Sequence, residues 1–399
     1  MHGPDRPRVL VAPDKFKGSL GAAAVAAAVR DGLLAQRPDL DVRVVPVADG
    51  GDGTLEAAVA AGFDPVEVDT VGPTGEPVTA RYARSGDLAV FELAEVVGLS
   101  RLPAGRPAPL TASTFGLGLL VAHALARGCR RLVLAVGGSA STDGGAGLLQ
   151  ALGARLTGPD GGPLPLGGAA LGALAGLDLA GLHPALAAAE VTLAADVDNP
   201  LLGEAGAAAV YGPQKGATRS DVGLLEQALT RWAQAVAGAV GRDESSASGA
   251  GAAGGTGFAA VAVLGARVRP GIELVLDLVG FPELVRGAVL VVTGEGSLDR
   301  QTLQGKAPLG VTRAAARAGV PVVAVAGRCL LGDDELAGAG LRAVYPLSVL
   351  EPDPVRSMAD AADLLRRVGA TIAREQLPAA ARAPDRTPDG SRPDAPRSS

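Results

Sequence analysis

Apolar, β-branched segments alternate with alanine-rich helical stretches along most of the chain, and this alternation constrains the fold most strongly. The segments RVLVAP, VRVVPVA, RLVLAVGG and EVTLAAD read as strands, and each is followed by a polar turn. Strands that alternate with helices build a mainly parallel sheet with helices on its faces. The sequence therefore predicts an α/β protein.

The middle of the chain has a different pattern from its two ends. Residues 65–99 read as antiparallel strands joined by glycine-containing turns, whereas the parallel pattern resumes from residue 288. We therefore expect one sheet domain, formed by residues 1–64 plus 286–378, that is interrupted by an inserted α/β domain of residues 65–285. Composition predicts a flexible linker at DESSASGAGAAGGTG and a disordered tail over 379–399.

Composition also limits the classes of partner. The net charge of −6 and the aromatic content of 3% argue against nucleic-acid binding. No apolar segment approaches the roughly 18–20 residues of a membrane span. Two cysteines and the lack of a signal sequence predict a cytoplasmic protein. The sequence makes no prediction of oligomeric state.

Lysine and asparagine are rare in this chain and cluster in short polar segments. Arginine supplies most of the basic charge, whereas lysine occurs only at Lys15, Lys17, Lys215 and Lys306, and asparagine only at Asn199. A chain that uses arginine for ordinary surface charge can keep lysine where a compact ammonium group is required. The 57 glycines make chance proximity to glycine the competing explanation.

Five polar segments follow predicted strands: PDKFKGS, ADGGDGT, GGSASTDGGAG, DVDNP and GEGSLDRQTLQGK. Together they would bring lysines, carboxylates and free backbone N–H groups to the same edge of the sheets. Phosphoryl transfer requires phosphate ligands, carboxylates for a divalent metal and a base. The chain has no P-loop, no dinucleotide fingerprint, no G-x-S-x-G elbow and no histidine pair with zinc-ligand spacing.

The segments resemble those of the ATP-dependent glycerate kinases of the first bacterial type. The matching motifs include VAPDKFKGSLGA, PVADGGDGTLEA, GGSASTDGGAG, ADVDNPL, GAAGGTG, GIELVLDLVGF and VTGEGSLDRQTLQGKAPLGV, in order over residues 8–375. The resemblance implies a Rossmann-like (flavodoxin-like) domain with an inserted α/β domain. It implies transfer of the ATP γ-phosphate to D-glycerate, giving 2-phosphoglycerate. Three positions depart from the pattern: Ser297 replaces a frequent arginine, Gln304 a frequent histidine and Thr142 a common asparagine.

Metal-ion and base roles follow from the chemistry of the carboxylates. We predict that Asp49 and Asp52 bind Mg²⁺, directly or through water, since hard divalent cations prefer such oxygens. Glu295 and Asp299 form a second metal or base pair. Asp196 and Asp198 are the candidates for orienting or deprotonating the acceptor hydroxyl. A solvated Asp-Gly turn is the alternative for Asp49 and Asp52.

The remaining site residues are predicted to bind substrate or phosphate. Lys306 would neutralise phosphate charge as a catalytic group, and Asn199 would hold the substrate. Lys15 and Lys17 would contact the glycerate carboxylate or a phosphate. Backbone N–H groups would hold the nucleotide phosphates at Gly137, Gly138, Ser139, Gly294 and Gly296.

Other functions stay open from the sequence. A glycerate 3-kinase, or a kinase of another small hydroxy acid, would use the same groups. An NAD-dependent dehydrogenase fits the alternating pattern but lacks the glycine fingerprint. A non-catalytic anion-binding protein would gain nothing from so many carboxylates among its lysines.

Overall fold

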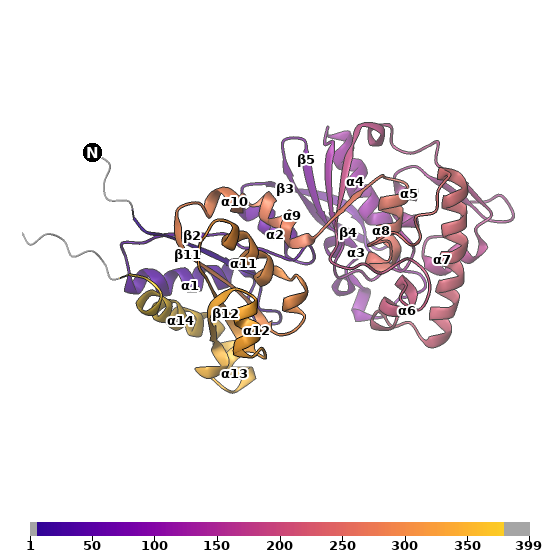
Figure 1. Ribbon diagram of the computed structural model, residues 1–399. Helices are drawn as coiled ribbons and strands as arrows, with labels where there is room; N and C mark the ends of the chain where they lie inside the picture. Colours follow the sequence, from indigo (N-terminus) through magenta and orange to yellow (C-terminus); the bar gives the residue numbers. More distant parts are fainter. Residues whose placement is uncertain (1–5, 379–399) are drawn as a thin grey trace, which may run out of the picture.

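The computed structural model describes residues 6–378 of the chain. The two ends of the described sequence, indigo and yellow, lie together in one half of the molecule, and the middle of the sequence fills the other half (Figure 1). Each half contains its own sheet, and strands alternate with helices through the first half and through part of the second. The predicted α/β fold class is confirmed.

The first sheet has five parallel strands in the order β13-β12-β11-β1-β2. Counted along the chain within this sheet alone, the order is 2-1-3-4-5, which is the flavodoxin-like arrangement. The strands are β1 (Arg8–Pro13), β2 (Asp41–Val44), β11 (Ala288–Leu298), β12 (Val322–Cys329) and β13 (Leu341–Pro346). Both predicted ends of the chain therefore contribute strands to one sheet.

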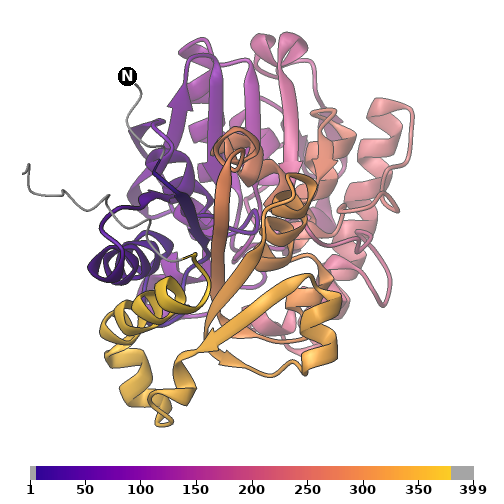
Figure 2. The same cartoon turned by 60° about the vertical axis from the view of Figure 1, so that its left-hand side comes forward.

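Alternation along β1 shows how this sheet is buried on both faces. Val9 and Val11 pack under α1 (Ala22–Gln36) and α14 (Ala361–Glu375), which lie side by side in Figure 2. Leu10 and Ala12 face α9 (Gly271–Leu278) and α11 (Ala307–Arg317) on the opposite side. Such two-sided burial requires the nearly continuous apolar strands seen in the sequence.

The second sheet has six strands in the order β10-β9-β6-β5-β4-β3. β10, β9, β6 and β5 are parallel, whereas β4 pairs antiparallel with both β5 and β3. The antiparallel strands predicted between 65 and 99 are thus confirmed. The strands are β3 (Asp64–Val71), β4 (Pro77–Ser85), β5 (Leu88–Glu92), β6 (Arg131–Ala135), β9 (Glu190–Ala194) and β10 (Arg267–Arg269).

Helices cover one face of the second sheet in two layers. Leucines of α4 (Phe115–Ala126) and alanines of α8 (Ala252–Ala262) pack directly on the strands. Outside them, Trp232 of α7 (Arg219–Val240) is fully buried against α5 (Ala146–Ala151) and α8. The smaller elements are α3 (Ala94–Val97), β7 (Arg155–Thr157), β8 (Gly176–Asp178), α6 (Ala207–Tyr211), α10 (Phe281–Leu284), α12 (Asp333–Gly338) and α13 (Pro354–Ala359).

Helices α2 (Thr54–Ala60) and α9 lie between the two sheets (Figure 1). Leu55 of α2 and Leu274 of α9 pack on the second sheet, whereas Ile272 of α9 packs on the first. The chain passes between the sheets at Gly50 and Gly271, where an added Cβ on Gly50 would lie only 2.4 Å from the Cα of Gly271. Gly50 also has a φ of +85°, so glycine is required there for both reasons.

The predicted flexible linker is wrong for its second half. Residues Ala253, Gly254 and Gly255 form a left-handed corner at the start of α8, and the helix that follows is buried. Glycine content there reflects close packing, not mobility. The predicted tail, 379–399, lies outside the described residues, and the domain boundaries at 64/65 and 285/286 stay predictions. Within residues 6–378, no helix combines the length and the apolar character that a membrane crossing requires.

Candidate functional site

A cavity of about 380 Å³ opens where the carboxyl ends of strands from both sheets meet. Four of the five polar segments predicted from the sequence line it: Lys17 after β1, Asp49 after β2, Gly137 after β6 and Asp196 after β9. Carboxyl ends of parallel strands are the usual place for ligands in open α/β sheets. The structure therefore brings together side chains that are up to 179 residues apart in the sequence, counted from Lys17 to Asp196.

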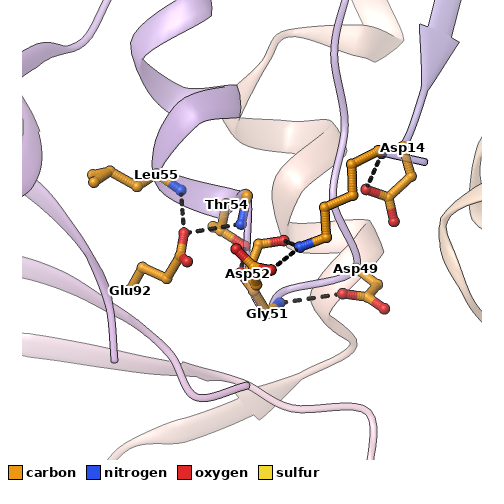
Figure 3. Close-up of polar contacts among 9 residues, drawn as sticks. Asp14, Asp49, Gly51, Asp52, Thr54, Leu55 and Glu92 are labelled. Carbon is orange, nitrogen blue, oxygen red and sulfur yellow. Dashed lines mark hydrogen bonds and ion pairs between the residues drawn. The ribbon is translucent and has the colours of Figure 1, made fainter. Parts of the chain in front are cut away.

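Asp49 and Asp52 are held differently although they lie in one loop (Figure 3). Asp49 lines the cavity, and its Oδ1 accepts a hydrogen bond from Gly51 N at 3.3 Å. Asp52 forms an ion pair with Lys15, whose Nζ also donates to the Asp52 carbonyl at 2.6 Å. Lys17 is exposed at the cavity wall. Asp49 and Lys17 are thus available to a ligand, whereas Lys15 and Asp52 neutralise each other.

Asp14 belongs to the same group, although only its lysine neighbours were predicted as site residues. Burial, and then the negative charge of Asp49, raise the pKa of Asp14 to about 7, and Glu295 adds to the effect. Lys15 N donates to Asp14 Oδ1 at 2.6 Å. Its position directly after the first strand, in PDK, was the signal that could have identified it.

Glu92 of β5 is a second residue that sequence reasoning missed. Its side chain is buried, and Oε2 accepts hydrogen bonds from Gly53 N and Leu55 N, each at 3.1 Å (Figure 3). Burial raises the pKa of Glu92 to about 7. The carboxyl group fixes the start of α2 and hence the loop that carries Asp49. Glu92 is the last residue of the apolar strand β5, and this position at a strand end was the signal that could have identified it.

The loop after β6 is held rigidly against the loop after β2. An added Cβ on Gly137 would lie 2.6 Å from the Cα of Gly51. Asp143, which is fully buried, accepts from Thr114 N at 2.8 Å and from Thr114 Oγ1 at 2.9 Å, and so anchors the loop from below. Ser139 is also buried, and its Oγ bonds within the loop to Ser141. Gly138 and Ser139 line the cavity beside Gly137, as the phosphate-binding prediction requires.

The segment after β9 separates its three predicted residues. Asp196 Oδ1 accepts a hydrogen bond from Gly271 N at 2.7 Å, and the carboxyl group lines the cavity. Partial desolvation at the cavity wall, together with the nearby charge of Asp49, raises the pKa of Asp196 to about 6. Asp198 is exposed and accepts from Ser248 Oγ at 2.5 Å. Asn199 bonds to Ala205 O and accepts from Tyr211 OH at 2.6 Å, so its amide is occupied by the protein.

The fifth polar segment begins inside β11, not after it, since Gly294, Glu295 and Gly296 belong to the strand, and it lies beside the cavity without lining it. Glu295 is buried and accepts from Thr302 Oγ1, and burial raises its pKa. Asp299 Oδ1 accepts from Gln301 N at 2.9 Å, and Lys306 Nζ donates to Gln301 Oε1 at 3.2 Å. Lys306 and Asp299 both act electrostatically on Glu295. These three predicted residues therefore form one local group.

The two predicted glycines of this segment contact protein backbone. Gly294 O accepts from Asp14 N at 2.8 Å, and an added Cβ on Gly294 would lie 2.2 Å from Val325 O. Gly296 faces the backbone of Phe16 and Lys17, and an added Cβ on Gly296 would lie 3.4 Å from the nearest of these atoms. Gly294 thus allows close packing against β12, and its carbonyl fixes the backbone of Asp14.

A guanidinium group lies beside Ser297, one of the three departures from the family pattern. Ser297 pairs in register with Arg328 on β12, and Arg328 Nε donates to Ser297 Oγ at 3.1 Å. A guanidinium group from the neighbouring strand thus lies beside position 297.

The predicted metal ligands do not form a ready ligand set. Among residues 6–378, no group of three or more histidine, cysteine, aspartate or glutamate side chains could hold a metal ion. Asp49 and Glu295 nevertheless interact electrostatically with each other and with Asp14. This concentration of negative charge is a suitable environment for a divalent cation that also binds phosphate oxygens.

Comparison with known proteins gives a consistent result over nearly the whole chain. The profile of the Glycerate kinase family matches residues 9–377. A glycerate kinase of Halalkalibacterium halodurans is 43% identical over 342 residues, covering 85% of this chain and 90% of the relative. The glycerate 2-kinase of Escherichia coli K12 is 41% identical over 323 residues, covering 80% and 85%. A crystal structure from Salmonella typhimurium LT2, described as a candidate glycerate kinase 2, is 40% identical with a TM-score of 0.81, covering 93% of this chain and 98% of that one.

Proposed function

The chain belongs to the glycerate kinase family, and we propose that it transfers the γ-phosphoryl group of ATP to the 2-hydroxyl of D-glycerate. The product is 2-phosphoglycerate. The observation that carries this proposal is the meeting of four family motifs around one cavity, with Asp196, Asp49 and Lys17 at its wall. Phosphoryl transfer depends mainly on positioning and on neutralising charge, and these groups supply both.

Asp196 is the proposed general base. A base works best when its pKa lies near the working pH, and the pKa of Asp196 is raised to about 6. The bond from Gly271 N holds the carboxyl group in place, so it is oriented before substrate binds. Asp198 is a weaker candidate for the base because it does not line this cavity and its carboxyl group is already bonded to Ser248.

Cations and backbone N–H groups are proposed to bind the substrates. Lys17 would contact the carboxylate of glycerate or a phosphate, and Lys306 would neutralise charge on the transferred group. The loop of Gly137, Gly138 and Ser139 would bind phosphate oxygens through its N–H groups, as glycine-rich turns commonly do. Lys15 would not bind substrate directly, because its ammonium group forms an ion pair with Asp52.

Mg²⁺ is proposed as the accompanying cation. Asp49 and Glu295 would hold it, with Asp14 close by, because each of these carboxylates makes ionisation of another less favourable. When bound, Mg²⁺ would neutralise negative charge on the phosphates. Asp52 and Asp299 are less suited, since Lys15 pairs with the first and Gln301 N bonds to the second. A cytoplasmic location stays a prediction from composition.

The test is a coupled assay of ADP release over a panel of small hydroxy acids, with and without Mg²⁺. We expect D-glycerate to give the highest kcat/KM, and NMR of the product to place the phosphate on the 2-hydroxyl. Phosphate on the 3-hydroxyl would show that the protein is a glycerate 3-kinase. A higher kcat/KM for another hydroxy acid would show that glycerate is not its main substrate. Binding of glycerate and nucleotide without turnover would support an anion-binding protein and contradict the proposal.

A further inference from the structure

Lys215 is a buried lysine at the cavity that has none of the catalytic or binding roles proposed so far. It ends the 3₁₀ turn Pro213–Lys215 between α6 and α7, and only 2% of its surface is exposed. It nevertheless lines the same cavity as Gly137 and Asp196. Lysine is almost never buried unless it is paired, so its position requires an explanation.

The ammonium group of Lys215 has fewer partners than it can take. An ammonium has three donors, and the one hydrogen bond that Nζ makes to the described residues goes to the carbonyl of Ser141. No carboxylate of the described chain lies within 4.0 Å of Nζ. Asp143 is near enough to favour the charged form, but its oxygens accept bonds from Ser113, Thr114, Gly145 and Gly147.

The backbone around Nζ is shaped to leave room for it. An added Cβ on Gly254 would lie 2.9 Å from Nζ and 2.1 Å from Ser141 O. The neighbouring Ala253 has a φ of +52°, which is strained for a residue other than glycine. Local strain of this kind persists where surrounding structure holds it, often at ligand sites. The left-handed corner before α8 therefore encloses the ammonium group and also lines the cavity through Ala252 and Ala253.

Electrostatics point to an anion as the missing partner. Burial lowers the pKa of Lys215 to about 7, and Asp143 opposes this effect only in part. The other charged groups at the cavity wall are Lys17, Asp49 and Asp196, and Asp196 is bonded to Gly271 N at the start of α9. An oxyanion beside Nζ would restore the full charge of the lysine and supply the absent acceptors.

We propose that Lys215 is a substrate-binding residue whose ammonium group holds an oxyanion at the floor of the cavity. The oxyanion is either the carboxylate of glycerate or a phosphoryl group of the nucleotide, which share this chemistry. The inference rests on the proposed function, because that function supplies both anions. The competing explanation is that Lys215 only braces the Ser141 carbonyl.

The test measures the binding of each anion separately by calorimetry. D-glycerate and a non-hydrolysable ATP analogue are titrated into wild type, Lys215→Met and the control Arg219→Met, which removes an exposed cation four residues away. A hydrogen bond to a charged group contributes about 1.5–3 kcal/mol, so we expect Lys215→Met to weaken one ligand roughly 10- to 150-fold. Weaker binding of D-glycerate would identify its carboxylate as the partner of Lys215, and weaker binding of the ATP analogue would identify a phosphoryl group. The control variant should bind both ligands with wild-type affinity.

Proton uptake separates ligand binding from a bracing role. At pH 8 a lysine with a pKa of about 7 is mostly neutral, and anion binding then draws a proton from the buffer. Calorimetry in two buffers of different ionisation enthalpy should therefore show more proton uptake in wild type than in Lys215→Met. The difference between the two proteins removes the contributions of Asp14, Glu92 and Asp196, which also have raised pKa values.

One outcome would overturn the inference. Affinities for both ligands within threefold of wild type would show that Lys215 only supports the loop. Lys215→Gln serves as the second variant if the methionine variant does not fold, with circular dichroism as the check. If wild type binds neither ligand and shows no turnover, the proposed function itself fails, which is a different result.

Discussion

The two walls of the cavity are built in opposite ways. The wall from the second sheet is held by packing and hydrogen bonds: Ser139 is buried in a loop that packs against another backbone and is anchored by Asp143, and Asp196 is bonded to Gly271 N. The wall from the first sheet carries the exposed side chain of Lys17, and Lys306 lies beside the cavity with one hydrogen bond, to Gln301. We call the closely packed wall the rigid wall, and the wall with the exposed lysine the charged wall.

This difference suggests a division of work between the walls. Groups that position a reacting atom need a fixed environment, because small displacements cost large factors in rate. Groups that neutralise phosphate charge tolerate more freedom, because long-range attraction does not require one geometry. We therefore expect the largest effects from changes at the rigid wall, and smaller ones at the charged wall.

The largest effect is expected from Asp196→Asn on the rigid wall. Asparagine keeps an oxygen for the bond from Gly271 N but removes the basic carboxylate. A general base contributes roughly 100- to 10,000-fold, and we expect kcat to fall by that factor in a steady-state assay. The control is Asp198→Asn, which changes an exposed carboxylate two residues away and should lower kcat far less. A larger loss in the Asp198 variant would exchange the two roles.

Glu92→Gln tests the carboxyl group that holds the loop of Asp49. Because folding raises the pKa of Glu92 from 4.5 to about 7, the folded state keeps a proton that the unfolded state loses, and stability falls as pH rises through this window. Glutamine does not titrate. The free energy of unfolding of the variant, relative to wild type, should therefore increase by about 2–3 kcal/mol between pH 5 and pH 8.

Urea unfolding at several pH values measures this difference. Glu56→Gln, on the exposed face of the same helix, is the matched control and should follow the wild-type pH profile. Parallel profiles for wild type and the Glu92 variant would show that the folded state holds Glu92 with an ordinary pKa.

Gly137→Ala tests the point where the loops of the two walls touch. The new methyl group would collide with the Cα of Gly51, which cannot move as a flexible side chain can. Overpacking of this kind costs about 1–3 kcal/mol, to be measured by denaturant unfolding, and kcat/KM should fall as well. Gly223→Ala, on the exposed face of α7, should instead gain up to about 1 kcal/mol. Equal effects in the two variants would mean that the loops separate easily.

The smallest effect is expected at Arg328, on the first sheet beside Ser297. If its guanidinium group replaces the arginine often found at position 297, Arg328→Ser should lower kcat/KM by roughly two- to tenfold, the range of one modest hydrogen bond. The double change S297R/R328S should restore activity. Arg342→Ser, which removes an exposed arginine from the adjacent strand β13, is the control. Failure of the double variant to recover would assign Arg328 a role of its own.

Periodicity predicted the sheets and their loops because strand alternation is a local property of the chain. It placed the polar segments after β1, β2, β6 and β9 at one edge, and the cavity confirms that arrangement. Periodicity missed Glu92, whose partners Gly53 and Leu55 lie at the start of α2, far from it along the chain. Composition predicted a linker at the glycines at the start of α8, because composition does not distinguish a flexible glycine from one that lies against another backbone. The rarity of lysine in this chain singled out Lys215, but only the tertiary packing shows that it is buried.

The contact between Gly50 and Gly271 has a consequence for movement of the two halves. Both connections between the sheets pass through this one point, so any opening of the cavity is expected to be a swing about it. Asp49 precedes the first glycine, and Asp196 is bonded to the second. The two carboxylates therefore sit on the pivot itself, and their spacing should stay constant while the outer groups, Lys306 among them, approach and retreat with each catalytic cycle.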